Sequence, residues 1–450
     1  MGLGGSLALP GFGAAPSFGR APLPRSANFA RTDAILEVQP SSWIRELGRS
    51  LALPRFALPA LALRLAACSD AAVGSNPQAG AEAPRLFVLV HGGPESSEAQ
   101  RAHGLTRGYP PERLRLGYRL GSRWAAARTW RAQIQAFGPE VLYVLGTALP
   151  GAVLGPVLGA RGRLPFVLDT GDVVYEMARS AGTRARGLLP LLRWFETLAQ
   201  RRARTVVVRG TRHGEYLRSQ GYPRVAVIRD GYTPAPPPSA EEVARLRERL
   251  GLRAQLVLGV MGSLVYSPRL RICYGWDLVQ ALALLRDAPV AGLVIGDGPG
   301  RTWLEGQARA HHVLERLTFC GWVPYAQVPV YLRLLDVALS TQTNNLAGQV
   351  RTTGKLPEYM AAGCYVLATR VGEAPLLLPE PMLLDYDGAV DEAYPRRLAE
   401  RVRWLAHNPQ ALAERGRLPA VAAQQCSYDL LSRQFQAVVR EAAPRAQAGG

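Results

Sequence analysis

The residues best suited to chemistry lie close together around position 355. Lys355 is the only lysine in the chain, although lysine and arginine together number 53. A compact ammonium and a planar guanidinium are not interchangeable at a binding site. Glu358 follows three residues later and can accept hydrogen bonds from two neighbouring hydroxyls, such as a ribose diol. The pair predicts that Lys355 reaches a phosphate and Glu358 a ribose. The alternatives are a lysine surviving by chance and a surface ion pair worth under about 1 kcal/mol.

Glycine-rich turns follow two apolar runs in the second half of the chain. Gly262 and Ser263 end the first run, and the segment Gly296-Asp297-Gly298-Pro299 ends the second. Such turns let backbone amides approach a phosphate or a base closely. A glycine after a strand is more often only a turn, so the glycines alone leave both readings open.

Both halves of the chain alternate short apolar runs with helical stretches. Strands are expected at 86–90, 141–145, 166–168, 205–208, 225–228, 256–261, 291–295, 317–319, 337–340 and 365–368. Helices are expected at 123–137, 188–201, 210–220, 240–250, 275–285, 302–311, 326–334 and 356–362. Continuous apolar strands between helices are typical of parallel sheets covered on both faces. The sequence therefore predicts an α/β protein with two Rossmann-like, doubly wound domains facing across a cleft.

Composition divides this pattern into segments. Residues 1–84 show no sustained period and are expected to form a disordered or weakly ordered extension, or to follow a misassigned start. A proline-rich stretch at 233–239 separates residues 85–232, the first Rossmann-like domain, from residues 240–424, the second. A final helix at 427–441 is expected to return to the first domain.

The charge and cysteine content narrow the class of protein. The formal net charge of +18 invites a nucleic-acid partner, but the arginines are dispersed and no nucleic-acid-binding motif accompanies them. Phosphates of the ligands, or peripheral contact with an anionic membrane surface, fit this charge better. No apolar run reaches the roughly 20 residues of a membrane-spanning helix. The five cysteines lack metal-ligand spacing and indicate a cytoplasmic protein.

Several segments resemble the family 4 glycosyltransferases, the large retaining GT-B group. The segment Lys355-Leu356-Pro357-Glu358-Tyr359-Met360-Ala361-Ala362-Gly363 is close to the family's Lys-Leu-Phe-Glu-Tyr-Met-Ala-Ala-Gly signature. The segment at 296–299, with Phe319, Gly321 and Val323 downstream, is similar to its Gly-Asp-Gly-Pro region. Asp230-Gly231 looks like its linker motif, with Arg229 where proline is usual. Gly372-Glu373-Ala374-Pro375 resembles its diphosphate-binding loop, although Glu373 adds a negative charge.

The resemblance, which runs from about residue 86 to 441, implies a function and a site. The function is transfer of a sugar from a nucleotide-diphosphate sugar donor to an unidentified acceptor, with retention and with neither cofactor nor metal. The donor-binding residues implied are Glu358, Gly262, Ser263, Gly296, Gly298, Val323, Thr353 and Gly372. Lys355 would stabilise the leaving diphosphate, as an electrostatic task. His91, Gly92 and Gly93 would form the acceptor side; the alternative is a turn with a surface histidine.

The chain also departs from the family pattern. Ser263 and Tyr274 stand where the family has an arginine and a lysine, and Arg269 and Arg271 are the nearest substitutes. Val350 replaces the first glutamate of the Glu-x7-Glu motif, so Thr352, Thr353 and Asn345 are candidates for sugar contacts. Gly171 replaces a histidine, leaving Asp172 to face the cleft or to cap a helix.

Two other functions are alternatives to a glycosyltransferase. The departures favour a noncatalytic GT-B subunit that binds a nucleotide or a glycan. A dinucleotide oxidoreductase is disfavoured because no strand ends in G-x-G-x-x-G with an acidic residue about 20 positions on. Asp385-Tyr386-Asp387 matches a metal-binding Asp-x-Asp in letters, but it follows a different strand from the one that bears this motif, and no metal site is expected.

Overall fold

A computed structural model describes residues 82–147, 155, 164–181, 189–254, 256–267 and 270–444. The chain divides into residues 1–80 and 81–450, and all described residues belong to the second unit. The predicted extension at 1–84 therefore lies almost entirely outside the described residues. None of the described helices combines the length and apolarity needed to cross a bilayer.

The first sheet is parallel throughout, with the spatial order β2-β1-β3-β4-β5-β6. Its strands are β1 (Leu86–Val90), β2 (Leu114–Tyr118), β3 (Val141–Leu145), β4 (Phe166–Thr170), β5 (Thr205–Val208) and β6 (Val225–Val227). The helices between them are α3 (Ser97–Leu105), α4 (Arg123–Phe137), α6 (Val174–Ala181), α7 (Leu189–Arg202) and α8 (Thr211–Ser219).

Strand β1 shows why these strands are apolar along their whole length. Leu86, Val88 and Val90 join a core that includes side chains of α3 and the last helix, α18 (Tyr428–Ala442). Phe87 and Leu89 join a second core with side chains of α4 and α7. Successive side chains of a strand point to opposite faces, so a sheet covered on both faces needs apolar residues at every position.

The second sheet is also parallel and has the order β11-β10-β7-β12-β13-β14. Its strands are β7 (Leu256–Met261), β10 (Val290–Ile295), β11 (Leu317–Gly321), β12 (Val337–Ser340), β13 (Tyr365–Thr369) and β14 (Leu383–Leu384). Counted within this sheet, the order is 3-2-1-4-5-6, the dinucleotide-binding arrangement whose ligands lie where the order reverses. That position is the carboxyl end of β7 and β12.

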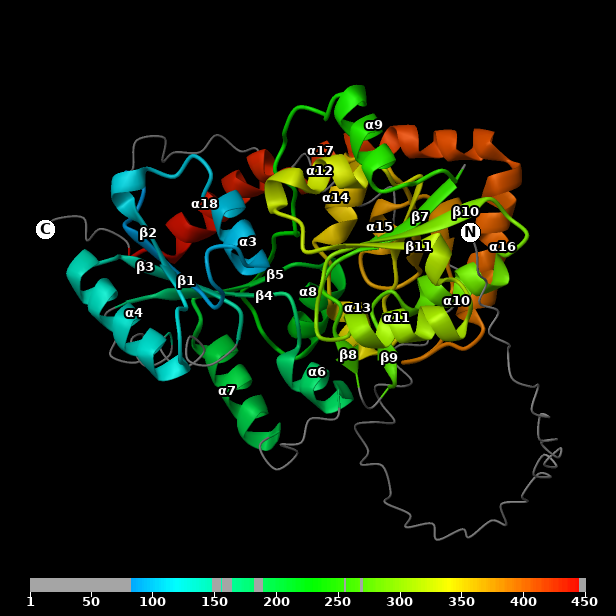
Figure 1. Ribbon diagram of the computed structural model, residues 1–450. Helices are drawn as coiled ribbons and strands as arrows, with labels where there is room; N and C mark the ends of the chain where they lie inside the picture. The colour runs from blue at the N-terminus through cyan, green and yellow to red at the C-terminus, as the bar shows by residue number, and fades with distance from the viewer. Residues whose placement is uncertain are drawn as a thin grey trace, which may run out of the picture. The chain divides into compact units, whose positions relative to one another are not determined.

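Helices cover both sides of the second sheet (Figure 1). On one side are α9 (Ala240–Arg249), α12 (Val328–Leu332), α14 (Lys355–Ala361) and α17 (Leu418–Cys426); on the other are α10 (Trp276–Leu284), α11 (Arg301–Ala310) and α16 (Tyr394–His407). Two short helices, α13 (Leu346–Val350) and α15 (Ala374–Leu377), lie in connecting segments. The predicted α/β fold with two doubly wound parallel sheets is confirmed.

At the edges of the two six-stranded sheets, β6 and β11 were predicted, whereas β2 and β14 were not. Strand β2 pairs with only one neighbour, and its apolar pattern is interrupted by the exposed Arg115 and by the buried Gly117. Strand β14 has only two residues and no periodicity to detect. An edge strand needs fewer apolar residues than a central one, so its signal in the sequence is weaker.

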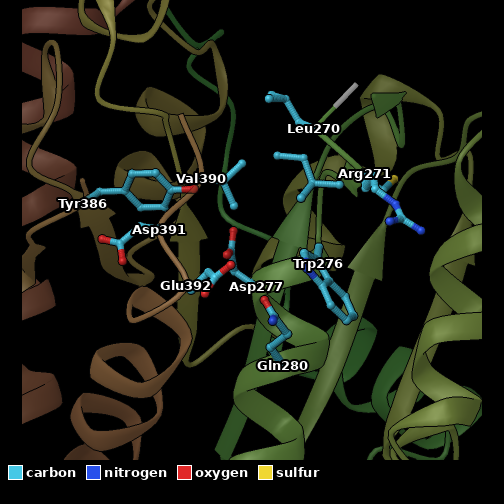
Figure 2. Close-up of a pocket in the computed structure, with 11 residues that line it drawn as sticks. Leu270, Arg271, Trp276, Asp277, Gln280, Tyr386, Val390, Asp391 and Glu392 are labelled. Carbon is cyan, nitrogen blue, oxygen red and sulfur yellow. The ribbon is translucent and has the colours of Figure 1, made fainter. Parts of the chain in front are cut away.

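The loop predicted after β7 is partly a hairpin. Its strands, β8 (Tyr266–Ser267) and β9 (Ile272–Cys273), are antiparallel. The hairpin borders a cavity of about 380 Å³ that is also lined by Trp276, Asp277 and Asp391 (Figure 2). Arg271 lies at this cavity in a left-handed conformation with φ of 53°. Arg269, the other predicted substitute, lies outside the described residues.

The chain passes twice between the two sheets at adjoining places. Tyr232 forms a β-bridge with Ser427, the residue that caps the start of α18. The Tyr232 amide donates to the Cys426 carbonyl at 3.0 Å, and the Tyr428 amide donates to the Tyr232 carbonyl at 3.1 Å. From this crossing α18 runs back against α3 and the first sheet. The two crossings are therefore joined by backbone hydrogen bonds.

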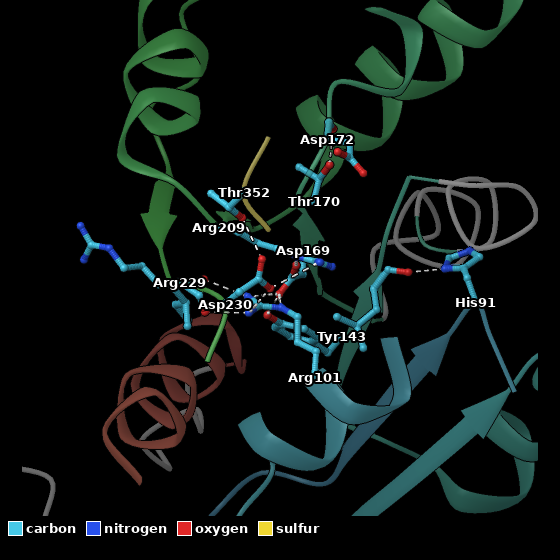
Figure 3. A network of polar contacts seen from close by, with 12 residues as sticks. His91, Arg101, Tyr143, Asp169, Thr170, Asp172, Arg209, Arg229, Asp230 and Thr352 are labelled. Atoms are coloured by element: carbon cyan, nitrogen blue, oxygen red, sulfur yellow. Dashed lines mark hydrogen bonds and ion pairs between the residues drawn. The ribbon is translucent and has the colours of Figure 1, made fainter. Parts of the chain in front are cut away.

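A buried ionic network lies at the carboxyl end of the first sheet (Figure 3). Arg101 of α3 donates to Asp169 at 2.8 and 2.9 Å, and Tyr143 donates to the same carboxylate at 2.6 Å. Arg209 approaches Asp169 at 3.1 Å and Asp230 at 3.5 Å. Burial alone would raise the pKa of Asp169, but the charges of Arg101 and Arg209 lower it below its usual range. The network holds the ends of β3, β4 and β5 to the linker after β6.

We expect Asp169→Asn to destabilise the protein by at least about 3 kcal/mol, because it leaves two buried arginines short of negative charge. The matched control is Asp429→Asn, which removes an exposed partner of Arg107 at 2.9 Å and should lower the free energy of unfolding by no more than about 1 kcal/mol. Urea unfolding measures both values. Because the pKa of Asp169 is lowered, the advantage of the wild type is present at neutral pH and disappears as pH falls through that pKa. Equal losses in the two variants would contradict this role.

Candidate functional site

Helix α14 carries both Lys355 and Glu358, and a buried tyrosine fastens it to the second sheet. The Met261 amide, at the end of β7, donates to the Tyr359 hydroxyl at 2.6 Å. Pro357 lies in the first turn of α14, where a missing N–H removes no helical hydrogen bond. Residues four apart share one face of a helix, so Lys355 lies on the same side as Tyr359 and reaches the turn after β7.

Lys355 contacts an aromatic ring and a glycine. Its Nζ lies 3.4 Å from the centre of the Tyr274 ring. A side chain at Gly262 would come within 2.5 Å of the Lys355 Cε, and the Gly262 φ of 148° also favours glycine. Burial, followed by the charge of Arg351, lowers the pKa of Lys355 to about 7. Within the described part of the chain, no carboxylate forms an ion pair with this ammonium.

Glu358 turns to a different partner. The Tyr325 hydroxyl, just beyond Val323 in the segment after β11, donates to Glu358 Oε1 at 2.5 Å. Burial raises the pKa of Glu358 to about 7, although the hydrogen bond from Tyr325 opposes that rise. The alternative reading of Lys355 and Glu358 as a simple surface ion pair is therefore wrong. Lys355 and Glu358 therefore contact different groups at different positions along α14.

The turns after β7, β10 and β11 meet backbone to backbone. The Gly262 amide donates to the Ile295 carbonyl at 2.8 Å, and the Gly296 amide donates to the Gly321 carbonyl at 2.9 Å. A side chain at Gly296 would lie 2.1 Å from the Gly262 carbonyl oxygen, and one at Gly298 would lie 2.5 Å from that of Leu264. These glycines are required by close approach of the chain. Of these turns, the one at Gly262 contacts Lys355, and the neighbouring Ser263 is exposed.

The loop at Gly372 has its expected glycine conformation, but its acidic neighbour has an unexpected role. Gly372 has a φ of 61°, and its amide donates to the Gln349 side chain at 3.2 Å. The Glu373 carboxylate forms an ion pair with Arg229 at 3.0 Å and accepts a hydrogen bond from the Thr211 amide at the start of α8. The negative charge that appeared unfavourable for a diphosphate loop is thus offset by Arg229, the residue that replaces the linker proline.

Three polar residues proposed for sugar contacts differ in their availability. Asn345 caps α13 by accepting from the Gly348 amide at 2.9 Å. The Thr352 hydroxyl donates to Asp230 at 2.8 Å (Figure 3). These two side chains already have partners. Thr353 lies two residues before Lys355, and its carbonyl accepts the Leu356 amide.

Asp172 does not cap the helix that follows it. The amides of Val174 and Tyr175, at the start of α6, donate instead to the buried Glu196 carboxylate at 2.8 and 3.0 Å. Asp172 Oδ1 lies 3.4 Å from the Nε of Arg351, which belongs to the segment between α13 and α14. Its position is therefore consistent with the first of the two readings, a carboxylate that faces the second sheet's loops.

His91 lies where β1 and β3 part, which is the reversal point of the first sheet. It is only 8% exposed, its Nδ1 is hydrogen-bonded to the Leu145 carbonyl, and its ring meets Trp130 edge-on. The alternative of a surface histidine is wrong. Gly92 lies against Ser96, the cap of α3, and Gly93 accepts from the Ser96 side chain at 2.7 Å. The glycines thus form the entry to α3.

Arg271 lies at a cavity that Lys355 does not line. It lines the cavity beside Trp276 and Asp277, whereas Arg351 is the described arginine whose charge acts on the pKa of Lys355. Asp385 forms an ion pair with Arg370 at 2.8 Å. Across the described ranges, no group of three or more His, Cys, Asp or Glu side chains is arranged to hold a metal ion.

Comparisons with known proteins bear on this arrangement. Residues 255–408 match the family model described as Glycosyl transferases group 1. The chain is 29% identical over 265 residues to a 2-deoxystreptamine glucosyltransferase from Streptomyces kanamyceticus, a match that spans 56% of this chain and 66% of the relative. The second sheet and every donor-side residue named above lie within the family match.

Solved structures extend the likeness to the first sheet. Anabaena HepE in complex with UDP-glucose superposes with a TM-score of 0.63 at 17% identity, covering 79% of this chain and 99% of HepE. Sucrose-phosphate synthase from Thermosynechococcus elongatus gives a TM-score of 0.62 at 15% identity, covering 79% and 98%. The predicted resemblance to glycosyltransferases is confirmed. The chain has the GT-B fold, and its residues 255–408 match the model for glycosyl transferases group 1.

Proposed function

We propose that the protein is a retaining glycosyltransferase that takes a sugar from a nucleoside diphosphate donor. The observation that carries this proposal is the position of Lys355. A partly buried ammonium on the Gly262 turn, with an aromatic ring below it and no carboxylate paired to it among the described residues, is a site for an anion. A diphosphate bound there would restore the charge that burial disfavours.

The donor's nucleoside would lie along α14 toward β11. Tyr325 occupies Glu358 Oε1, so Oε2 is left to accept hydrogen bonds from a ribose diol. The base would lie beside Val323 and the turns at Gly296 and Gly298, where the chain presents backbone groups. In this arrangement one ligand would extend from Glu358 to Lys355, where the strand order of the second sheet reverses.

In the transfer, the bond between the sugar's anomeric carbon and the diphosphate oxygen breaks while the acceptor oxygen bonds to that carbon. The proton of the acceptor hydroxyl leaves with the diphosphate. Negative charge on the departing oxygen grows as the bond lengthens, and Lys355 stabilises it without a metal or a cofactor. The acceptor would enter from the side of His91 and Asp172. The donor is inferred to be a UDP-sugar because HepE was solved with UDP-glucose and the S. kanamyceticus relative is named a glucosyltransferase.

A noncatalytic nucleotide-binding subunit is the second candidate. Val350 replaces a carboxylate that would contact the transferred sugar, and Ser263 and Tyr274 replace two cations. Both candidates use Lys355 and Glu358 to bind a nucleotide, so only turnover separates them. Wild-type protein that binds UDP yet neither transfers nor hydrolyses any of a panel of nucleotide sugars would leave the binding subunit as the better description.

Substitutions at the two positions should have different effects on binding and turnover. Glu358→Gln should weaken UDP and donor binding together, since its hydrogen bonds exist before and during transfer. Lys355→Met should reduce kcat by about 100-fold, more than it reduces affinity. Lys355→Arg should recover only part of that loss, because the larger, planar guanidinium would collide with the Gly262 turn. Calorimetry gives the affinities and donor hydrolysis gives kcat; an equal fall of affinity in all three variants with unchanged kcat would refute these roles.

The pH dependence of binding follows from the two shifted groups. The Lys355 pKa of about 7 means that the free site loses its positive charge as pH rises above 7, so UDP affinity should fall by up to about tenfold per pH unit and binding should take up a proton. The Glu358 pKa of about 7 means that uridine affinity should fall as pH drops below 7. Calorimetry in buffers of different ionisation enthalpy measures the proton uptake. Lys355→Met should abolish the alkaline decline, and its persistence in that variant would assign the decline to another group.

A further inference from the structure

A nucleoside diphosphate carries more negative charge than one lysine offsets. The two positions where a cation was expected hold Ser263 and Tyr274, and Tyr274 supports Lys355 through its ring. Arg271 lines a separate cavity. A second positive group near Lys355 must therefore come from another part of the chain.

Most arginines near the crossing between the two sheets already have partners. Arg209 approaches both Asp169 and Asp230, and Arg229 forms an ion pair with Glu373 at 3.0 Å. Arg351 is different, because its side chain is 53% exposed and its one ion-pair partner is Asp172 at 3.4 Å. Asp172 Oδ1 is buried yet accepts no hydrogen bond from the described residues, so the Arg351 contact is a loose one. A guanidinium held this loosely can change partners.

The backbone of Arg351 is firmly placed between the two glycine turns. Its carbonyl accepts from the Gln342 side chain at 3.0 Å and lies 3.4 Å from the place where a side chain at Gly372 would begin. Lys355, four residues later, touches Gly262. The segment from 351 to 355 thus joins the turn after β7 to the turn after β13, with a cation at each end. The positive charge of Arg351 lowers the pKa of Lys355, and burial lowers that pKa more.

We propose that Arg351 is the second cation of the diphosphate site, and that it leaves Asp172 to bind the diphosphate when the donor enters. This inference rests on the proposed function. A phosphate offers a guanidinium two oxygens in a fork geometry, which is stronger than the single 3.4 Å contact with Asp172. In the empty site, the contact with Asp172 holds the Arg351 side chain until the donor enters.

The test measures binding of UDP, UMP and uridine to the full-length protein by calorimetry. Arg351→Gln should weaken UDP binding by about tenfold, UMP binding by less, and uridine binding not at all. Arg351→Lys should recover part of the loss. The matched control is Arg417→Gln, since Arg417 is 55% exposed and forms one ion pair, with Glu414 at 2.9 Å; it should bind all three ligands as the wild type does. Thermal unfolding of each variant shows that the fold is intact.

A second variant tests the role of Asp172 separately. Asp172→Asn releases Arg351 and should leave UDP binding equal or up to about fivefold tighter, with uridine binding unchanged. Weaker UDP binding in this variant would overturn the exchange of partners, and unchanged UDP binding in Arg351→Gln would overturn the second cation. Either result leaves the proposed function standing if wild-type protein binds UDP. Wild-type protein that binds none of UDP, GDP and ADP would instead refute the proposed function.

Discussion

The buried pair of Arg101 and Asp169 is the interaction on which the arrangement of the two sheets depends. A guanidinium inside a protein is tolerated only with its partners in place, and here those partners come from β4 and the linker after β6. Tyr143 of β3 donates to the same Asp169 carboxylate. Asp230, in the same linker, then accepts from Thr352 in the loop before α14. Polar contacts therefore run without a break from α3 to the segment that carries the two proposed phosphate-binding cations.

The electrostatics of the site follow from which charges are already paired. Arg209 and Arg229 are turned toward carboxylates, and Glu373 is occupied by Arg229, so these groups contribute little net charge to a ligand. Lys355 faces a ring instead of a carboxylate, and burial lowers its pKa toward neutrality. Burial disfavours the charged form of Lys355 in the empty site, and a bound anion would stabilise that form. This behaviour is expected of a site that binds a diphosphate.

Backbone, more than side chains, forms the rest of the donor surface. The glycines after β7, β10 and β11 approach one another so closely that a Cβ atom at Gly296 would lie 2.1 Å from a carbonyl oxygen. Such a surface can meet a base and a diphosphate without contributing specificity for the sugar. Val350 stands where the family's first Glu-x7-Glu carboxylate is expected, so under the proposed function sugar selection would fall to the acceptor side and to residues such as Thr353.

The sequence by itself determined the two parallel sheets, the turns at Gly262 and Gly296, and the placement of Lys355 and Glu358 on one helix. Each is a local property: apolar runs report burial on both faces, and spacing along a helix reports which residues share a side. Strand β2 was missed because Arg115 and Gly117 interrupt its apolar pattern. The partners were decided only by the tertiary structure. Arg101 meets Asp169 across 68 residues and Arg229 meets Glu373 across 144, and the crossovers between strands, which no local periodicity records, bring those side chains together.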